Sequence, residues 1–116
     1  MTLVESPKAV HDLPDGLLER IVARLNPVRV ILFGSRASGT QHPGSDWDLL
    51  VVVDDETRPE QVDWQVMGEV LKVTDKPVDL IPMRHRTFRE RGDVIGSLAW
   101  IASHKGVPVY ERADAL

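Results

Sequence analysis

The sequence predicts an α/β (α+β) domain in which helices flank a small mixed β-sheet. Two kinds of segment alternate along the chain. Short apolar runs, bounded by glycine, proline or charged residues, are typical of buried strands, and longer stretches carry apolar residues at helical spacing. With 116 residues, 42% of them hydrophobic, the chain has the size of a single domain with one core. We expect a flexible lead-in over residues 1–11 and one domain over 12–116.

The first predicted helix lies between Asp12, which can cap its amino end, and Pro27, which ends it. Pro14 fits the first turn because the amide of a first-turn residue has no helical partner to lose. Apolar residues recur at helical spacing between these limits and predict one buried face. That face consists of Leu17, Leu18, Ile21, Val22 and Leu25.

Two strands are predicted after this helix. The run 28–33 is apolar and rich in β-branched residues, and Pro27 and Gly34 bound it. A connection over 34–45, which contains three glycines, three serines and one proline, leads to a second strand over 46–53.

A second amphipathic helix and a third strand are predicted in the middle of the chain. Thr57 and Glu60 have the spacing of a capping box, which would start the helix. The third strand covers 78–83 and is interrupted by Pro82. The apolar stripe of the helix consists of Val62, Val66, Met67, Val70 and Leu71.

The carboxy-terminal part predicts two further helices and an edge strand. Residues 84–91 form a basic, helical stretch, Asp93 can cap the last helix, and Gly106 can end it. Residues 107–110 predict a short strand, which Pro108 confines to an edge because proline donates no ladder hydrogen bond. The buried side of the last helix is expected to carry Val94, Ile95, Leu98, Ile101 and Ala102.

Charge and composition argue against several classes of protein. The net charge of −4 disfavours a long nucleic-acid track, which needs a basic surface. The basic stretch 84–91 is either a solvated helix or a local patch for an acidic partner or RNA. Cysteine is absent, which excludes disulfides and thiolate metal sites. Neither a signal peptide nor about 18 consecutive apolar residues is present, so we expect a soluble, cytoplasmic protein that enters no membrane.

The second predicted strand begins with two carboxylates. Because side chains alternate along a strand, Asp46 and Asp48 point to the same side and Trp47 to the other. Trp47 is therefore expected to pack in the core. Neighbouring carboxylates repel unless a cation lies between them, and oxygen ligands suit Mg²⁺ or Mn²⁺. Alone, such a pair is more often a cap or part of a solvated loop.

A third acid and a glycine turn complete the candidate site. Asp79 lies in an apolar strand, where an unpaired charge would be costly. If that strand pairs with the second one, three carboxylates converge and can hold two metal ions for phosphoryl transfer. Gly34 lets backbone approach a ligand closely, and Ser35 offers a hydroxyl and an amide to phosphate. A Gly-Ser pair alone is only a turn, so the prediction depends on the combination.

The residues 32–39 and 45–51 resemble the MNT family of minimal nucleotidyltransferases, in the DNA polymerase β-like superfamily. That family's pattern is Gly-Ser, ten residues, then Asp-x-Asp, with a third acid on a later strand. Here the ten residues are 36–45. The resemblance covers roughly residues 12–110, and it implies the nucleotidyltransferase (polymerase β-like) fold.

The resemblance also implies a function for each site residue. It implies a metal-dependent transfer of a nucleoside monophosphate from a nucleoside triphosphate, usually ATP. Two Mg²⁺ ions, or Mn²⁺, would be held by Asp46, Asp48 and Asp79, and Asp79 would help to deprotonate the acceptor hydroxyl. Gly34 and Ser35 would hold the β- and γ-phosphates, with Arg36 and Ser45 as further nucleotide-binding candidates. For Arg36, a solvated arginine is an equal alternative.

Three hypotheses for the acceptor remain open. MNT proteins of this size are often antitoxins paired with a HEPN ribonuclease toxin, which implies adenylylation of a toxin tyrosine within a hetero-oligomer. The alternatives are a transferase acting on a small molecule such as an aminoglycoside, and a non-catalytic antitoxin that only covers its partner. The chain is expected to be too short for an acceptor-binding lobe of its own, which favours the first hypothesis.

Overall fold

The structure, a computed structural model, describes residues 13–115. The expected lead-in over 1–11 and the expected cap Asp12 lie outside the described residues. Within 13–115, no helix is long and apolar enough to cross a membrane.

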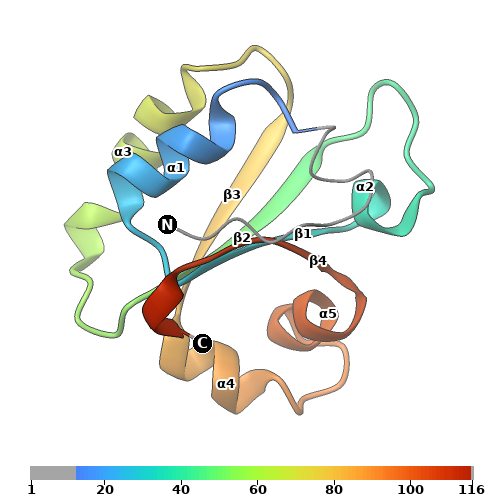
Figure 1. Ribbon diagram of the computed structural model, residues 1–116. Coiled ribbons are helices and arrows are strands. Elements are labelled where there is room, and N and C mark those ends of the chain that lie inside the picture. Colours follow the sequence, from blue (N-terminus) through green and yellow to red (C-terminus); the bar gives the residue numbers. More distant parts are fainter. Residues whose placement is uncertain (1–12, 116) are drawn as a thin grey trace.

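A four-stranded mixed sheet forms the centre of the molecule, in the order β3-β2-β1-β4 (Figure 1). β1 is antiparallel to both of its neighbours, and β2 and β3 are parallel to each other. The predicted α+β architecture with a small mixed sheet is therefore confirmed. The strands are β1 (Arg29–Phe33), β2 (Trp47–Val53), β3 (Val78–Arg84) and β4 (Val107–Glu111).

Helices cover both faces of this sheet. α1 (Leu17–Leu25) and α3 (Trp64–Leu71) lie on one face, and α4 (His85–Arg91) and α5 (Leu98–Lys105) lie on the other (Figure 1). The short helix α2 (Ser35–Ser38) follows β1 directly.

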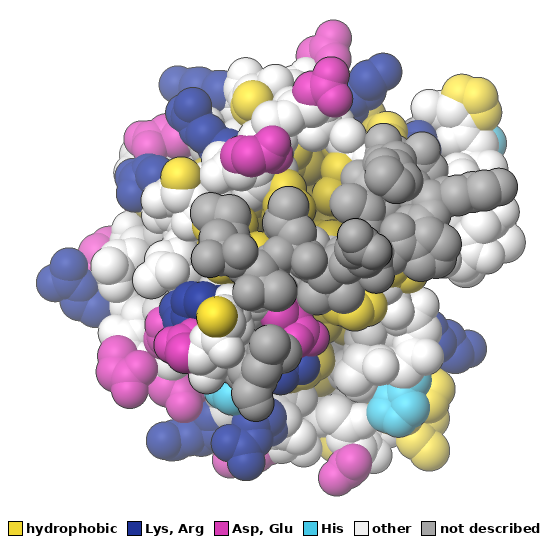
Figure 2. Space-filling model, in the orientation of Figure 1, with side chains coloured by type: hydrophobic (Ala, Val, Ile, Leu, Met, Phe, Trp, Pro, Cys, Tyr) yellow, Lys and Arg dark blue, Asp and Glu magenta, His cyan; other side chains and the backbone are white. Residues whose placement is uncertain are grey.

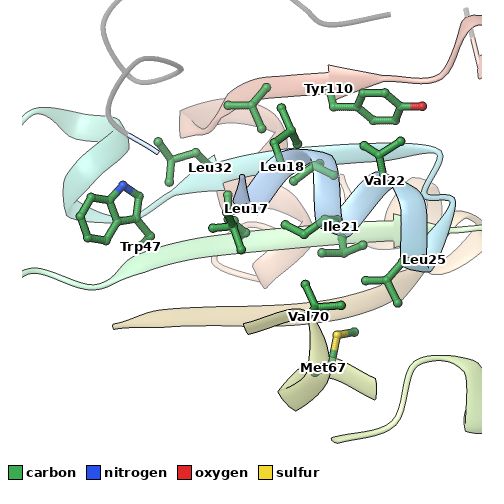
Figure 3. Packing of buried hydrophobic residues seen from close by; sticks show 14 of the residues in the cluster. Leu17, Leu18, Ile21, Val22, Leu25, Leu32, Trp47, Met67, Val70 and Tyr110 are labelled. Atoms are coloured by element: carbon green, nitrogen blue, oxygen red, sulfur yellow. The ribbon is translucent and has the colours of Figure 1, made fainter. Parts of the chain in front are cut away.

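Two apolar clusters result, because successive residues of β1 and β2 point to opposite faces. The larger cluster joins α1 and α3 to the sheet and includes Trp47, Leu49 and Val51 (Figure 3). The smaller cluster joins α4 and α5 to Leu50 and Val52. Burial on both faces explains why β2 reads as a continuous apolar run.

α1 has the predicted apolar face, but it begins later than expected. Leu17 is its first residue, and Gly16 precedes it with φ 77° and no side-chain cap. Pro14 lies before the helix, where its carbonyl accepts a hydrogen bond from the Leu17 amide at 3.1 Å. The helix ends at Leu25, and Asn26 adopts the left-handed conformation just before Pro27.

The predicted capping box at Thr57 and Glu60 is wrong. Asp63 caps α3, and its carboxylate accepts a hydrogen bond from the Val66 amide at 3.0 Å. A separate 3₁₀ turn, Pro59–Gln61, occupies the region where the helix was expected to start. An Asp cap directly ahead of the apolar stripe satisfies an amide that the more distant box cannot reach.

The predicted start of the last helix is also wrong. Ser97, and not Asp93, caps α5 by accepting a hydrogen bond from the Trp100 amide at 3.1 Å. Gly96, with φ 87°, lies immediately before this cap. Val94 and Ile95 therefore precede α5, and they are 44% and 80% exposed.

Both strands that contain proline lie at edges of the sheet. Pro82 does not interrupt β3, because an edge strand can leave one amide position unpaired without breaking its ladder with β2. β4, which contains Pro108, is the opposite edge, as predicted.

Candidate functional site

Asp48 lies on the face of the sheet that α4 and α5 cover, because it alternates in β2 with Trp47 and Leu49 of the other cluster. Asp46 immediately precedes β2, and Asp48 is its second residue. Asp48 alternates with Trp47, which is buried in the α1–α3 cluster at 7% exposure. The predicted separation from the tryptophan is confirmed for Asp48, whereas Asp46 was expected in the strand and lies just before it.

β3 brings the third acid beside the second. In the parallel register of β2 and β3, Asp48 is opposite Asp79. The two carboxyl groups are close enough for each to affect the charge of the other. Asp79 is exposed, so the expectation that it lies in a costly apolar environment is wrong: β3 is an edge strand, and its start faces solvent.

Asp48 has an unfavourable environment for its negative charge. The pKa of Asp48 is raised above its ordinary value, and burial of the carboxyl group is the largest cause. The negative charges of Asp79 and Asp46, and hydrogen bonding with Asp79, raise it further. Two facing carboxyl groups remain together only if a proton or a cation offsets their repulsion. The clustered carboxylates around Asp48 therefore favour binding of a cation.

The turn after β1 lies against Asp48, since Phe33 pairs with Asp48 in the antiparallel ladder. Gly34 has φ 77° and ψ −157°. A Cβ atom at this position would lie 2.5 Å from Oδ2 of Asp48. Only glycine therefore allows the backbone to approach the acid this closely.

Ser35 begins α2 directly after this turn, and it is partly exposed. Ala37 is the first residue whose amide bonds back to the carbonyl of Gly34, at 3.1 Å. The amide and hydroxyl of Ser35 thus lie ahead of the hydrogen-bonded part of the helix, beside the acids.

The other two nucleotide-binding candidates have contacts inside the chain. Nε of Arg36 donates to the carbonyl of Ser45 at 3.0 Å, and Nη2 donates to the carbonyl of His42 at 3.4 Å. The hydroxyl oxygen of Ser45 accepts from the His42 amide at 2.9 Å. These contacts favour a structural role for Arg36 and Ser45.

The donor set suits a hard divalent cation. Within residues 13–115, no group of three or more acidic or histidine side chains is closed around a position for a metal ion. The acids supply only carboxylate oxygens, which are the ligands of Mg²⁺ and Mn²⁺, and the like charges around Asp48 favour a bound cation. The residues present therefore fit a divalent metal site that additional ligands, such as phosphate oxygens, would complete.

The basic stretch 84–91 lies at the other end of β3. On the face seen in Figure 2, basic and acidic side chains are interspersed. Within this stretch, Arg86 lies 3.9 Å from Asp55, which also accepts a hydrogen bond from the Arg86 amide at 2.8 Å. Its role as a solvated helix or as a patch for an acidic partner stays a prediction.

Sequence comparisons relate the chain to nucleotidyltransferases. The chain matches the family model of the nucleotidyltransferase domain over residues 15–99. The protein adenylyltransferase MntA of Aphanizomenon flos-aquae is 29% identical over an alignment of 65 residues. That alignment covers 48% of this chain and 43% of the MntA chain, so it spans less than half of the relative's length.

Solved structures with the same fold include toxin–antitoxin complexes. A toxin–antitoxin structure with AMP-PNP and a mutant of the toxin–antitoxin MntA–HpeT both superpose with a TM-score of 0.58, at 22% and 18% identity. Both superpositions cover 88% of this chain, and they cover 77% and 76% of the matched chains, respectively. A protein from Sulfolobus solfataricus assigned as a nucleotidyltransferase has a TM-score of 0.56 at 20% identity, with 94% and 93% coverage.

The matched residues 15–99 contain the Gly34-Ser35 turn and all three acids, and they make up most of the chain. The chain therefore belongs to the nucleotidyltransferase domain family.

Proposed function

We propose that this protein transfers AMP from ATP to a hydroxyl group of a partner protein, and that it is the antitoxin of a HEPN-type ribonuclease toxin. The observation that carries the proposal is the contact of the Gly34 turn with Asp48, which itself faces Asp79. The turn that we propose to bind phosphate and the paired carboxylates therefore lie side by side.

The acids and the turn have separate roles in the proposed reaction. Asp46, Asp48 and Asp79 would hold two Mg²⁺ ions, or Mn²⁺, which would supply positive charge to the triphosphate when bound. Gly34 and Ser35 bind the β- and γ-phosphates through backbone amides and the Ser35 hydroxyl. The turn thereby orients the α-phosphate toward the acids.

Asp79 acts on the acceptor. The acceptor oxygen attacks the α-phosphorus, the bond from that phosphorus to the bridging oxygen of the β-phosphate breaks, and pyrophosphate leaves. The proton of the acceptor hydroxyl passes to the carboxylate of Asp79. Asp79 is exposed on an edge strand, so a hydroxyl on another protein can reach it.

The names of similar proteins support a toxin as the partner protein. The similar MntA protein is named a protein adenylyltransferase, and two similar structures are toxin–antitoxin complexes. A toxin partner fits these names, and the exposure of Asp79 would let a tyrosine hydroxyl of that partner reach the acid.

A labelling experiment tests the transfer. With Mg²⁺ and ATP labelled in the α-phosphate, the purified protein should label the small helical protein encoded beside it. Asp46→Asn should abolish the labelling, because the mutation removes one of the anionic metal ligands. Asp93→Asn, at an exposed acid outside the site, is the matched control and should label like the wild type. Equal labelling by wild type and Asp46→Asn would refute the catalytic assignment.

The same variants separate transfer from neutralisation by binding alone. If binding suffices, Asp46→Asn will protect cells from the toxin as well as the wild type does. If transfer is required, Asp46→Asn will bind the toxin but fail to protect. Transfer to an aminoglycoside, with no labelling of the partner protein, would favour the small-molecule alternative.

A further inference from the structure

Arg36 connects the two halves of the candidate site. Its guanidinium lies over the ring of Trp47, with Cζ 3.4 Å from the ring centroid. In the same position it donates to the carbonyls of Ser45 and His42. One side chain on α2 therefore contacts the first residue of β2 and the loop that leads into β2.

These contacts connect the two ends of the segment between the Gly34-Ser35 turn and Asp46. Gly34 and Ser35 are separated from Asp46 by ten residues. Ser45, the last of the ten, is bound through its carbonyl to Arg36, and its hydroxyl and amide are both bonded to His42. Ser45 is also buried, at 7% exposure. Every polar group of Ser45, the residue next to Asp46, is thus hydrogen-bonded.

The contacts of Arg36 lie on the Trp47 side of β2. Trp47 belongs to the α1–α3 cluster, whereas Asp48 alternates to the opposite face. A guanidinium that stacks on Trp47 and bonds two loop carbonyls is directed away from the acids and their substrate. These three contacts require a planar guanidinium group, which can stack on a ring and donate several hydrogen bonds at once. The ammonium group of a lysine cannot make all three.

We propose that Arg36 is a positioning residue, which holds Asp46 at the correct distance from the Gly34-Ser35 turn by binding Ser45 and Trp47. It does not bind the nucleotide. The proposal rests on the proposed transfer function for its kinetic consequences, but the clamp itself can be tested without any transfer.

Amide hydrogen exchange tests the clamp directly. Arg36→Lys keeps the positive charge but loses the fork and the stack, so the amides of His42 and Ser45 should exchange about tenfold faster or more, as the loop opens locally. Arg89→Lys, at an exposed arginine of α4, is the matched control and should leave these amides unchanged. Unchanged exchange in Arg36→Lys would overturn the proposal, whatever the outcome of the labelling experiment.

Kinetics then distinguish positioning from phosphate binding. If Arg36 positions Asp46, Arg36→Lys should lower kcat about tenfold or more and change KM for ATP less than about threefold. If Arg36 instead binds phosphate, lysine should largely preserve function, and Arg36→Met should raise KM for ATP about tenfold or more. The second pattern would overturn the proposal.

Trp47→Leu provides a second variant that leaves the charge of Arg36 in place. The clamp predicts that it accelerates exchange at Ser45 and lowers kcat as Arg36→Lys does, and that the double variant is no worse than either single one. Additive losses in the double variant would contradict a shared clamp. Thermal unfolding of each variant confirms that the fold persists.

Discussion

At the scale of single residues, the candidate site contains a carboxylate whose position disfavours its charge and a position that only glycine can occupy. Asp48 is partly buried beside two other acids, and the pKa of its carboxyl is raised as a consequence. Gly34 lies in the left-handed region of φ and against this same acid. The charge of Asp48 is costly in a domain without a ligand, and a bound cation would offset that cost. The conformation of Gly34 is accessible because glycine has no Cβ atom.

Replacing Gly34 with alanine should destabilise the fold and abolish transfer. The combination of φ 77° and ψ −157° is essentially restricted to glycine and costs roughly 1–3 kcal/mol for a residue with a Cβ atom. The new Cβ would also lie 2.5 Å from Oδ2 of Asp48, so the acid must move. Thermal unfolding and the labelling assay measure the two effects.

Gly39 provides the matched control for this variant. Its φ is 83°, but a Cβ at this position meets nothing within 4 Å. Gly39, with ψ 10°, is in the ordinary left-handed helical conformation, so Gly39→Ala should lose less stability than Gly34→Ala and retain transfer. If Gly34→Ala is as active as Gly39→Ala, contact of the turn with Asp48 does not matter for the reaction.

At the scale of helices and strands, the pairing of the strands positions the candidate site. Parallel pairing of β2 with β3 places Asp79 opposite Asp48, and antiparallel pairing of β1 with β2 places the Gly34 turn beside it. α3 packs on the opposite face through Val66, Met67 and Val70 and supports the strands from behind. The caps that start the helices therefore affect the site only through stability.

Asp63→Ala should lower the stability of the domain by about 1 kcal/mol, because the first turn of α3 loses the acceptor for the Val66 amide. Thr57→Ala is the control and should change the free energy of unfolding by less than about 0.5 kcal/mol. Urea denaturation of the two variants measures this difference. A larger effect of Thr57→Ala would restore the capping box that the sequence pattern suggests.

At the scale of the whole molecule, one ion-pair network joins distant parts of the chain. Arg112, which follows β4, donates to both oxygens of Asp54 at 3.0 and 2.9 Å, just beyond the end of β2. It also donates to the carbonyl of Asn26, which follows α1, at 3.2 Å. The arginine thereby links the ends of a helix and two strands, at the end of β2 remote from the candidate site.

This network predicts a pH-dependent contribution to stability. The hydrogen bond from Arg112 is the largest influence on Asp54 and lowers its pKa. Because the folded pKa is below the unfolded value of about 3.9, the stabilisation is complete above that value. It is lost as the pH falls through the folded pKa, when the native carboxylate becomes protonated.

Asp54→Asn should therefore cost no more than about 1 kcal/mol at pH 7, since the pair is partly exposed. The difference from the wild type should shrink below about pH 4, as protonation removes the same charge in the wild type. Urea denaturation across this pH range measures both. A difference that does not depend on pH would show that Asp54 acts through something other than its charge.

The local patterns of the sequence determined the secondary structure, the face of each strand residue and the candidate acids. Alternation along 46–53 suffices to separate Asp46 and Asp48 from Trp47, because it depends only on the geometry of an extended backbone. Apolar spacing likewise predicts the buried faces of α1 and α3. Caps are less certain, because Thr57 and Asp93 are as suitable by composition as Asp63 and Ser97.

Only the tertiary structure decided how these parts meet. The register that places Asp48 opposite Asp79 depends on which strands pair, and no local pattern contains that information. The exposure of Asp79 depends on β3 being an edge strand. The contact of Arg36 with Trp47 joins α2 to β2 across a loop, and no local pattern predicts how that loop folds. The sequence therefore supplied the candidate groups, and packing of the whole chain determined their neighbours and the role that we propose for Arg36.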